Sequence, residues 1–356
     1  MTALCIFQKS PSLARKLSSV SVMAFAILWL GAVTAAVPTT VASDGASLTL
    51  PSVAAQLQAD YRQQQWQRLS AKSDRDSLIA AILIGLPTES PADPMGGQAD
   101  LEKRLAEMSP KDPLALFVLA LACQAKSPSC LDAHYYDALV RHAPDNAVHW
   151  LLLPTGQSPN PAQLHQASLA SFADSHTREL ARIVRAALGE LPIVAAPTGI
   201  DPRELALLQR RNAVDRLAYP SLVGVMAACR TPGKPNSADC VAIARKLIAD
   251  RSGSILPTMV GSAMIRRLRK GTPEAAAAIE LRRDYVWLSI KGPLDSEDAA
   301  SEEAFRAEMA QHGEWDAWQR RLERQGASRK PPSGWTPPDP QVMLLAEDRT
   351  PATPAK

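Results

Sequence analysis

Apolar positions recur along most of the chain at intervals of three and four residues, which is the spacing of an amphipathic α-helix. Clusters of proline and glycine interrupt this pattern and mark the turns. Long alternating runs of Val, Ile and Thr, which would indicate strands, are missing, and aromatic residues make up only 5% of the sequence. The pattern predicts an all-α fold. In the first half, helices are expected at 52–69, 77–86, 98–108, 162–174 and 176–188.

The helical pattern restarts in the second half, after a stretch at 189–199 that contains prolines and glycines. Thr272 is suited to cap a helix there, and Pro273 is suited to its first position. The last helix, 297–325, is acidic at its start and basic at its end, as the helix dipole favours, and has a break near Gly313. The other helices expected in this half lie at 203–217, 221–228, 240–249, 257–270 and 273–290.

One pattern recurs at a fixed offset of 34 residues. A loop with a capping signal and an apolar helix at 110–119 returns at 144–153, and a second helix lies between the two copies. This period, and the sequence of the second copy, resemble the tetratricopeptide repeat. The residues that carry the resemblance are Leu116, Trp150, Leu119, Leu153 and Tyr136.

The resemblance covers roughly residues 75–175, and its clearest unit is 110–153. It implies αα-hairpin repeats that stack into a superhelix, or an irregular helical array. Proteins of this kind usually bind peptides or other proteins and usually catalyse nothing. The resemblance therefore favours a binding function over an enzymatic one.

The N-terminus has the features of a secretory signal peptide at 1–36. Basic residues and no acidic ones precede an apolar run that ends in small residues around Ala35. The alternative is an uncleaved membrane anchor, because 20–37 comprises 18 largely apolar residues, near the lower limit for a span. The small residues favour cleavage, and no cysteine follows the run to support a lipoprotein anchor. Residues 37–51 are predicted to form a flexible leader.

Removal of the signal peptide changes the charge of the protein. The whole chain has 39 basic and 36 acidic residues, and three of the basic ones lie in 1–36, so the mature chain has a net charge of 36 − 36, or zero. The mature chain as a whole therefore gives no electrostatic support to a nucleic-acid or anionic-membrane partner. The targeting segment predicts a periplasmic or secreted protein.

Cysteine usage agrees with export, because the mature chain keeps an even number of cysteines. They are Cys123, Cys130, Cys229 and Cys240. Three pairings are open, and the most economical joins Cys123 to Cys130 and Cys229 to Cys240, since each pair flanks a turn that contains proline. A metal site is the alternative, but these spacings lack the Cys-x-x-Cys knuckle of zinc sites.

Prolines recur without periodicity from Pro331 to the C-terminus. Such a composition predicts a mostly disordered tail. The predicted organisation is a signal peptide at 1–36, a leader at 37–51, an N-terminal helical-repeat region at 52–190, a linker at 191–200, a C-terminal helical region at 201–326 and a disordered tail at 327–356.

No motif in the sequence carries a recognisable chemistry. The His-Glu-x-x-His, Gly-x-Ser-x-Gly, phosphate-loop and dinucleotide signatures are all missing. Ser70 with Lys72 resembles a dyad, and carboxylates lie close to His312, but both groups are on polar helices where a solvated face is expected. The helix dipole explains the basic run at 266–270 as well as an anionic ligand does. We predict no catalytic residue, no metal and no cofactor.

Aromatic residues mark the candidate contact surfaces. On the last helix, 297–325, an apolar stripe either packs against 273–290 as a cap or stays exposed for a partner. Burial is favoured, because exposed aromatic stripes on exported proteins promote aggregation. The stripe consists of Phe305, Met309, Trp315, Trp318 and Leu322, and the candidate partner contacts are Trp66, Trp315 and Trp318.

Different classes of function fit these observations. The favoured one is an exported, non-catalytic helical-repeat protein that binds a protein or peptide partner in the cell envelope. The first alternative is a helical-repeat hydrolase or lyase that acts on cell-envelope polymers with carboxylates from separate helices. A deep acidic cleft would favour this enzyme, and a shallow groove would count against it. The second alternative is a membrane-anchored scaffold that retains its N-terminal helix.

Overall fold

A computed structural model describes residues 50–86, 97–125, 134–153, 157–189, 220–230, 236–292, 299–345 and 348–349. The all-α prediction is confirmed: these ranges are helical, and their one contact of β type is an isolated bridge between Asn146 and Phe172. The signal segment 1–36, the linker 191–200 and the helix expected at 203–217 lie outside the described residues. So does nearly all of the leader.

The described helices follow one another along the chain. They are α2 (Leu50–Ser70), α3 (Arg75–Gly85), α4 (Gln98–Met108), α5 (Pro113–Gln124), α6 (Tyr135–His142), α7 (Ala147–Leu151), α8 (Pro161–Leu169), α9 (Thr177–Leu188), α11 (Val223–Ala228), α12 (Ser237–Ile248), α13 (Ile255–Leu268), α14 (Pro273–Lys291), α15 (Ala299–His312), α16 (Glu314–Arg324) and the 3-10 helix η3 (Pro340–Met343).

Side-chain caps explain where several of these helices begin. Asp112 accepts hydrogen bonds from the first backbone N–H groups of α5, and Asn146, 34 positions later, does the same for α7. Thr272 caps α14 as expected, and Pro273 occupies its first position. The fixed offset in the sequence is therefore an offset between two equivalent helix starts.

The clearest repeat unit forms a helical hairpin. α5 packs against α6, and the Tyr136 hydroxyl donates to the Ala120 carbonyl over 3.0 Å. Tyr136, the aromatic residue of the second helix in the repeat, thus contacts Ala120, a small residue of the first helix. The second copy is cut short, because α7 ends at Leu151, close to Pro154 in the sequence.

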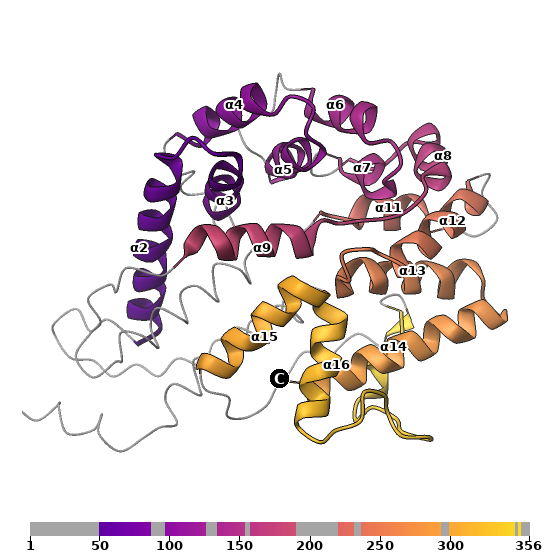
Figure 1. Ribbon diagram of the computed structural model, residues 1–356. Helices are drawn as coiled ribbons and strands as arrows, with labels where there is room; N and C mark the ends of the chain where they lie inside the picture. The colour runs from indigo at the N-terminus through magenta and orange to yellow at the C-terminus, as the bar shows by residue number, and fades with distance from the viewer. Residues whose placement is uncertain are drawn as a thin grey trace, which may run out of the picture.

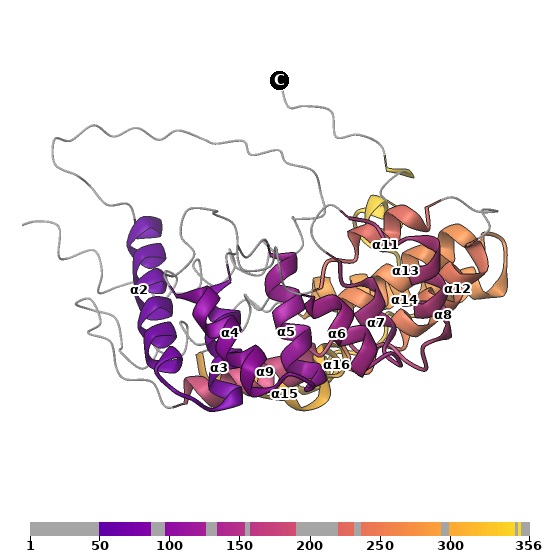
Figure 2. The ribbon, with the colours of Figure 1, turned by 90° about the horizontal axis from the view of Figure 1, so that it is seen from above.

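The helices form an arch that closes on itself. Figure 1 shows α2 to α8 following one another along the arch, with α9 running beneath it. α12 packs on α8, and α13 and α14 follow, while α15 returns to α9 and α16 contacts α14. Both views place α15 beside α9 (Figures 1 and 2), where Arg185 and Glu303 form an ion pair of 2.8 Å.

One hydrophobic core spans both halves of the chain. α3 and α5 are apolar on almost every side and are buried over most of their length, as expected for central helices. The core runs from Tyr61 in α2 to Ala278 in α14, so the regions expected at 52–190 and 201–326 share it. A smaller cluster at the C-terminal end is built on Trp287, Leu288 and Leu322.

The expected helix 297–325 is two helices, α15 and α16, which meet at Gly313. Gly313 has a φ of 90°, which ends α15 and turns the chain. The turn brings Phe305 and Trp318 together, with ring centroids 4.6 Å apart. Phe305 and Leu322 are buried, and Trp315 and Trp318 pack half-buried against the smaller cluster. The stripe is therefore largely covered within the molecule.

The proline-rich segment departs from the expectation of a disordered tail over the part that is described. Residues 327–345 cross α14 through a series of turns, with the Trp335 N–H bonded to the Pro332 carbonyl, Trp335 against Trp287 and a short 3-10 helix at Pro340–Met343. Composition does not show this, because side chains of α13 and α14 donate hydrogen bonds to backbone carbonyls of the segment.

Candidate functional site

The connector between α8 and α9, residues 170–176, organises the candidate site. The sequence pattern predicts a helix to 174, but α8 ends at Leu169 because the next backbone groups bond elsewhere. The N–H groups of Ser171 and Phe172 donate to the Asp145 carbonyl over 2.9 and 3.2 Å, and the Phe172 carbonyl accepts from Ala147 over 2.8 Å. One end of the connector lines an open hollow, and the other enters a buried polar network.

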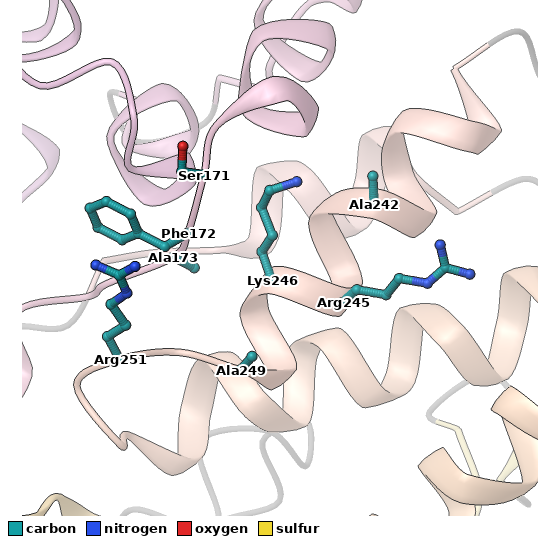
Figure 3. A pocket seen from close by; sticks show the side chains of 8 residues that line it. All are labelled: Ser171, Phe172, Ala173, Ala242, Arg245, Lys246, Ala249 and Arg251. Carbon is teal, nitrogen blue, oxygen red and sulfur yellow. The ribbon is translucent and has the colours of Figure 1, made fainter.

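The hollow lies between the connector and α12, and it has a volume of about 480 Å³. Figure 3 shows the Arg251 guanidinium against the Phe172 ring and the Arg245 side chain pointing away from that ring. The guanidinium carbon of Arg251 lies 3.8 Å from the Phe172 ring centroid, a cation–π geometry. The lining residues are Ser171, Phe172, Ala173, Ala242, Arg245, Lys246, Ala249 and Arg251.

The hollow is positively charged. Arg245 is neutralised by Glu274, which accepts two hydrogen bonds of 2.7 and 3.0 Å. Lys246 donates to the Ser168 carbonyl over 2.6 Å, and partial burial lowers the pKa of its ammonium. Neither Lys246 nor Arg251 has an ion pair with any described residue. These two cations are therefore available to an anionic group from outside.

The buried network centres on Asp250, in the loop between α12 and α13. Its carboxylate accepts hydrogen bonds from the Ser175 N–H over 2.9 Å, from the Ser175 hydroxyl over 3.1 Å and from the Ser252 hydroxyl. Thr177 donates to the Ser252 hydroxyl over 2.9 Å. Burial raises the pKa of the Asp250 carboxyl, although the hydrogen bonds act in the opposite direction.

Two histidines from separate helices lie next to this network. His149 of α7 and His176 at the start of α9 approach with their Nε2 atoms 3.0 Å apart and their rings stacked at 5.3 Å. Nδ1 of His149 lies 3.0 Å from the Ala143 carbonyl, and the Asn146 amide lies 3.0 Å from His149 Nε2. Burial is the main cause that lowers the pKa of His149 to about 3, and the nearby His176 is the second cause. The His149 imidazole is therefore neutral.

This arrangement lacks the parts of a hydrolytic centre. The Ser175 hydroxyl is fully buried and is bonded to Asp250 and Ser252 rather than to an imidazole that could act as its base. His149 is only 2% exposed, which leaves its imidazole no access to a substrate. Among the described residues, no three His, Cys, Asp or Glu side chains are placed to hold a metal ion.

The second predicted disulfide is present. Cys229, directly after α11, and Cys240 of α12 are bonded with a Cα–Cα distance of 5.7 Å. Cys123 is also disulfide-bonded, but Cys130 lies outside the described residues, so the first pairing stays a prediction.

The three candidate tryptophans lie apart from the hollow and are half-buried. Trp66 packs over the backbone of Gly85 and Gly97, at the edge of the main core. Trp315 and Trp318 pack against the smaller cluster, and a Cβ added to Gly292 would clash with the Trp318 ring. Each of them therefore has a packing role.

The basic run at 266–270 and the carboxylates beside His312 also have structural partners. Arg266 donates to the Met343 carbonyl, and Arg269 lies 3.5 Å from Glu274. Glu314 accepts from the Ile255 N–H over 3.0 Å. In the part of the chain that the structure describes, none of the helices combines the length and the apolar character that crossing a membrane requires.

Sequence reasoning missed the hollow, because its residues come from separated segments and follow no local motif. Local periodicity gives no signal for the connector, because the pattern continues the predicted helix to Asp174, past the observed end of α8 at Leu169. The chain matches no known protein family, and no characterised protein or solved structure is significantly similar to it.

Proposed function

We propose that the protein is an exported, non-catalytic helical protein that binds a protein or peptide partner in the cell envelope. The hollow binds an acidic group of that partner. The observation that carries this proposal is a pair of cations, Lys246 and Arg251, in an open cavity. Neither of them forms an ion pair with a described residue. A carboxylate placed there gains charge-assisted hydrogen bonds. The Phe172 ring offers an apolar contact beside it.

Export rests on the basic and apolar pattern of 1–36 and is compatible with the Cys229–Cys240 disulfide, since disulfides persist in oxidising compartments. A membrane-anchored scaffold differs from this proposal only in retaining that N-terminal segment. Intact-mass measurement of the exported protein separates the two, because cleavage leaves a chain that begins near Ala36.

A hydrolase or lyase has less support. Such enzymes need a pair of carboxylates at a cleft that admits a polymer. The hollow is open and basic, and the buried carboxylate nearest to it, Asp250, is enclosed by serine side chains. The polar groups of the network therefore serve to join loops and are not presented to a substrate.

Charge reversal in the hollow tests the proposal. The mature chain and its Arg251→Glu variant are used to capture partners from envelope extract, and the captured proteins are compared by quantitative mass spectrometry. The variant is expected to lose at least about tenfold of the captured partner, which corresponds to about 1.4 kcal/mol or more of binding free energy.

The matched control is Arg141→Glu, which makes the same charge change at an exposed position of α6. Capture by this variant should equal that of the unchanged chain. Equal capture by Arg251→Glu and Arg141→Glu would show that the hollow does not bind the partner.

A further inference from the structure

The proline-rich segment 327–345 is held on α13 and α14 by an unusual set of contacts. Side-chain N–H groups of the helices donate to backbone carbonyls of the segment. Arg283 donates to the Pro332 and Trp335 carbonyls over 2.7 and 3.0 Å. We call the donors the arginine face: Arg266, Arg282, Arg283 and Trp287.

The other donors of the arginine face follow the same rule. The Trp287 indole donates to the Ser328 carbonyl over 2.8 Å, and the Arg266 guanidinium donates to the Met343 carbonyl. Arg282 donates through Nε and Nη2 to the Val342 carbonyl over 2.9 and 2.7 Å, and burial lowers the pKa of its guanidinium. Each bond is made to a group that every amino acid has.

A face of donors suits one kind of polypeptide particularly well. Proline has no backbone N–H, so a proline-rich strand presents carbonyls as its main polar backbone groups. Such a strand also loses little conformational entropy when it binds, because proline already fixes its backbone. The arginine face therefore matches the chemistry of the segment and depends little on its exact side chains.

One aromatic side chain, Trp335, anchors the segment on α14. Trp335 stands edge-on to Trp287, with ring centroids 5.2 Å apart and an interplanar angle of 82°. Trp287 itself is almost buried in the smaller cluster. This edge-to-face pair is an apolar contact between the segment and α14, and an aromatic residue of another strand can replace Trp335 there.

Most of the segment is exposed on its outer side. Residues 328–330, 332–334, 336 and 338–340 are exposed, and the other residues of the segment are half-buried. Gly326, which joins the segment to α16, has a φ of 71°, and a Cβ added to it would meet no atom within 4 Å. To take the place of the segment, a partner strand has to replace its hydrogen bonds to the arginine face, its Trp335–Trp287 contact and the ion pair of Arg329 with Glu323.

We propose that the arginine face is a docking surface for a proline-rich segment of a partner protein, which the chain's own segment 327–345 occupies when the partner is absent. This proposal rests on the proposed function in so far as that function is polypeptide binding. It adds a second surface, separate from the hollow, and the chemical class of its partner.

The test uses a fluorescent synthetic peptide with the sequence of 328–345 and the full mature chain. In the unchanged chain the attached segment competes with the peptide. Trp335→Ala removes the anchor of that segment and leaves the arginine face intact, so this variant should bind the peptide at least about tenfold more tightly than the unchanged chain.

Added substitutions identify the surface. In the Trp335→Ala background, Arg282→Ala or Trp287→Phe should weaken peptide binding severalfold, whereas Arg320→Ala, at an exposed position of α16, should not change it. A peptide whose prolines are replaced by alanine should also bind more weakly. Circular dichroism checks that each variant is folded, and Trp287→Phe keeps an aromatic ring in the cluster.

Three results would overturn the proposal. The Trp335→Ala chain fails to bind the peptide, or binds it equally well with Arg282→Ala. The third is a concentration-dependent dimer that requires Arg282, seen by sedimentation, since this assigns the face to the segment of a second copy. Arg251→Glu should leave peptide binding unchanged, so failure at the hollow and failure at the arginine face are distinguished.

Discussion

At the scale of single residues, the histidine pair shows how far local reasoning extends. The sequence identifies His149 as part of a repeat, since Asn146 stands 34 residues after Asp112 and caps the equivalent helix. It does not show that His176, which begins another helix, lies 3.0 Å away. That contact depends on the path of the connector, which no local pattern specifies.

The pair makes the stability of the fold depend on pH. In the folded chain the pKa of His149 is about 3, against about 6.5 in an unfolded chain, so below pH 6.5 the unfolded state binds more protons. Stability therefore falls as the pH drops from 6.5 towards 3. Between pH 7 and pH 4, His149 should account for a loss of about 3 kcal/mol in the free energy of unfolding.

Chemical denaturation at these two pH values measures this contribution. His149→Phe cannot be protonated, so its loss of stability between pH 7 and pH 4 should be smaller by that amount. His134→Gln serves as the control, because His134 is exposed at the start of α6 and its substitution should leave the loss unchanged. The prediction is wrong if His149→Phe and the unchanged chain lose equal stability on acidification.

At the scale of elements, helices were predictable and their meeting points were not. The capping signal at Thr272 locates the start of α14, and the break near Gly313 is visible in the sequence. The periodicity places the stripe on one helix, 297–325, whereas Gly313 turns the chain and brings Phe305 onto Trp318. A sequence shows that a glycine interrupts a helix, but the direction of the turn depends on distant backbone, here that of Gly253.

Two glycines with positive φ differ in how closely other backbone approaches them. Gly271 has a φ of 80° with open space around it, whereas a Cβ on Gly313, with a φ of 90°, would lie 2.9 Å from the Cα of Gly253. Gly271→Ala should cost about 1 kcal/mol of stability from backbone strain alone. Gly313→Ala should cost at least about 2 kcal/mol, because the φ of 90° and ψ of 161° at Gly313 lie in a region nearly restricted to glycine, and the contact with Gly253 adds to that strain. Equal melting temperatures for the two variants would show that the loops at Gly313 and Gly253 separate easily.

At the scale of the whole molecule, polar loops connect the two helical regions that the sequence pattern separates. The boundary at 189–199 suggests two regions, but the structure gives them one core. Asp250 binds the backbone and side chain of Ser175, and the next residues of its loop bind the start of α16, where the Trp315 N–H donates to the Gly253 carbonyl over 3.1 Å. Such contacts depend on long-range topology and leave no periodic signal in the sequence.

The shared core predicts that both regions unfold together, in a single thermal transition. Asp250→Ala should leave the Ser175 and Ser252 groups buried without their acceptor and lower the free energy of unfolding by about 3 kcal/mol. Asp250→Asn keeps the shape and one acceptor oxygen, so it should cost less than alanine. Asp316→Ala breaks a surface pair with Arg320 and should stay within about 0.5 kcal/mol of the unchanged chain. Calorimetry that resolved two transitions in the unchanged chain would show that the loops around Asp250 do not couple the two regions.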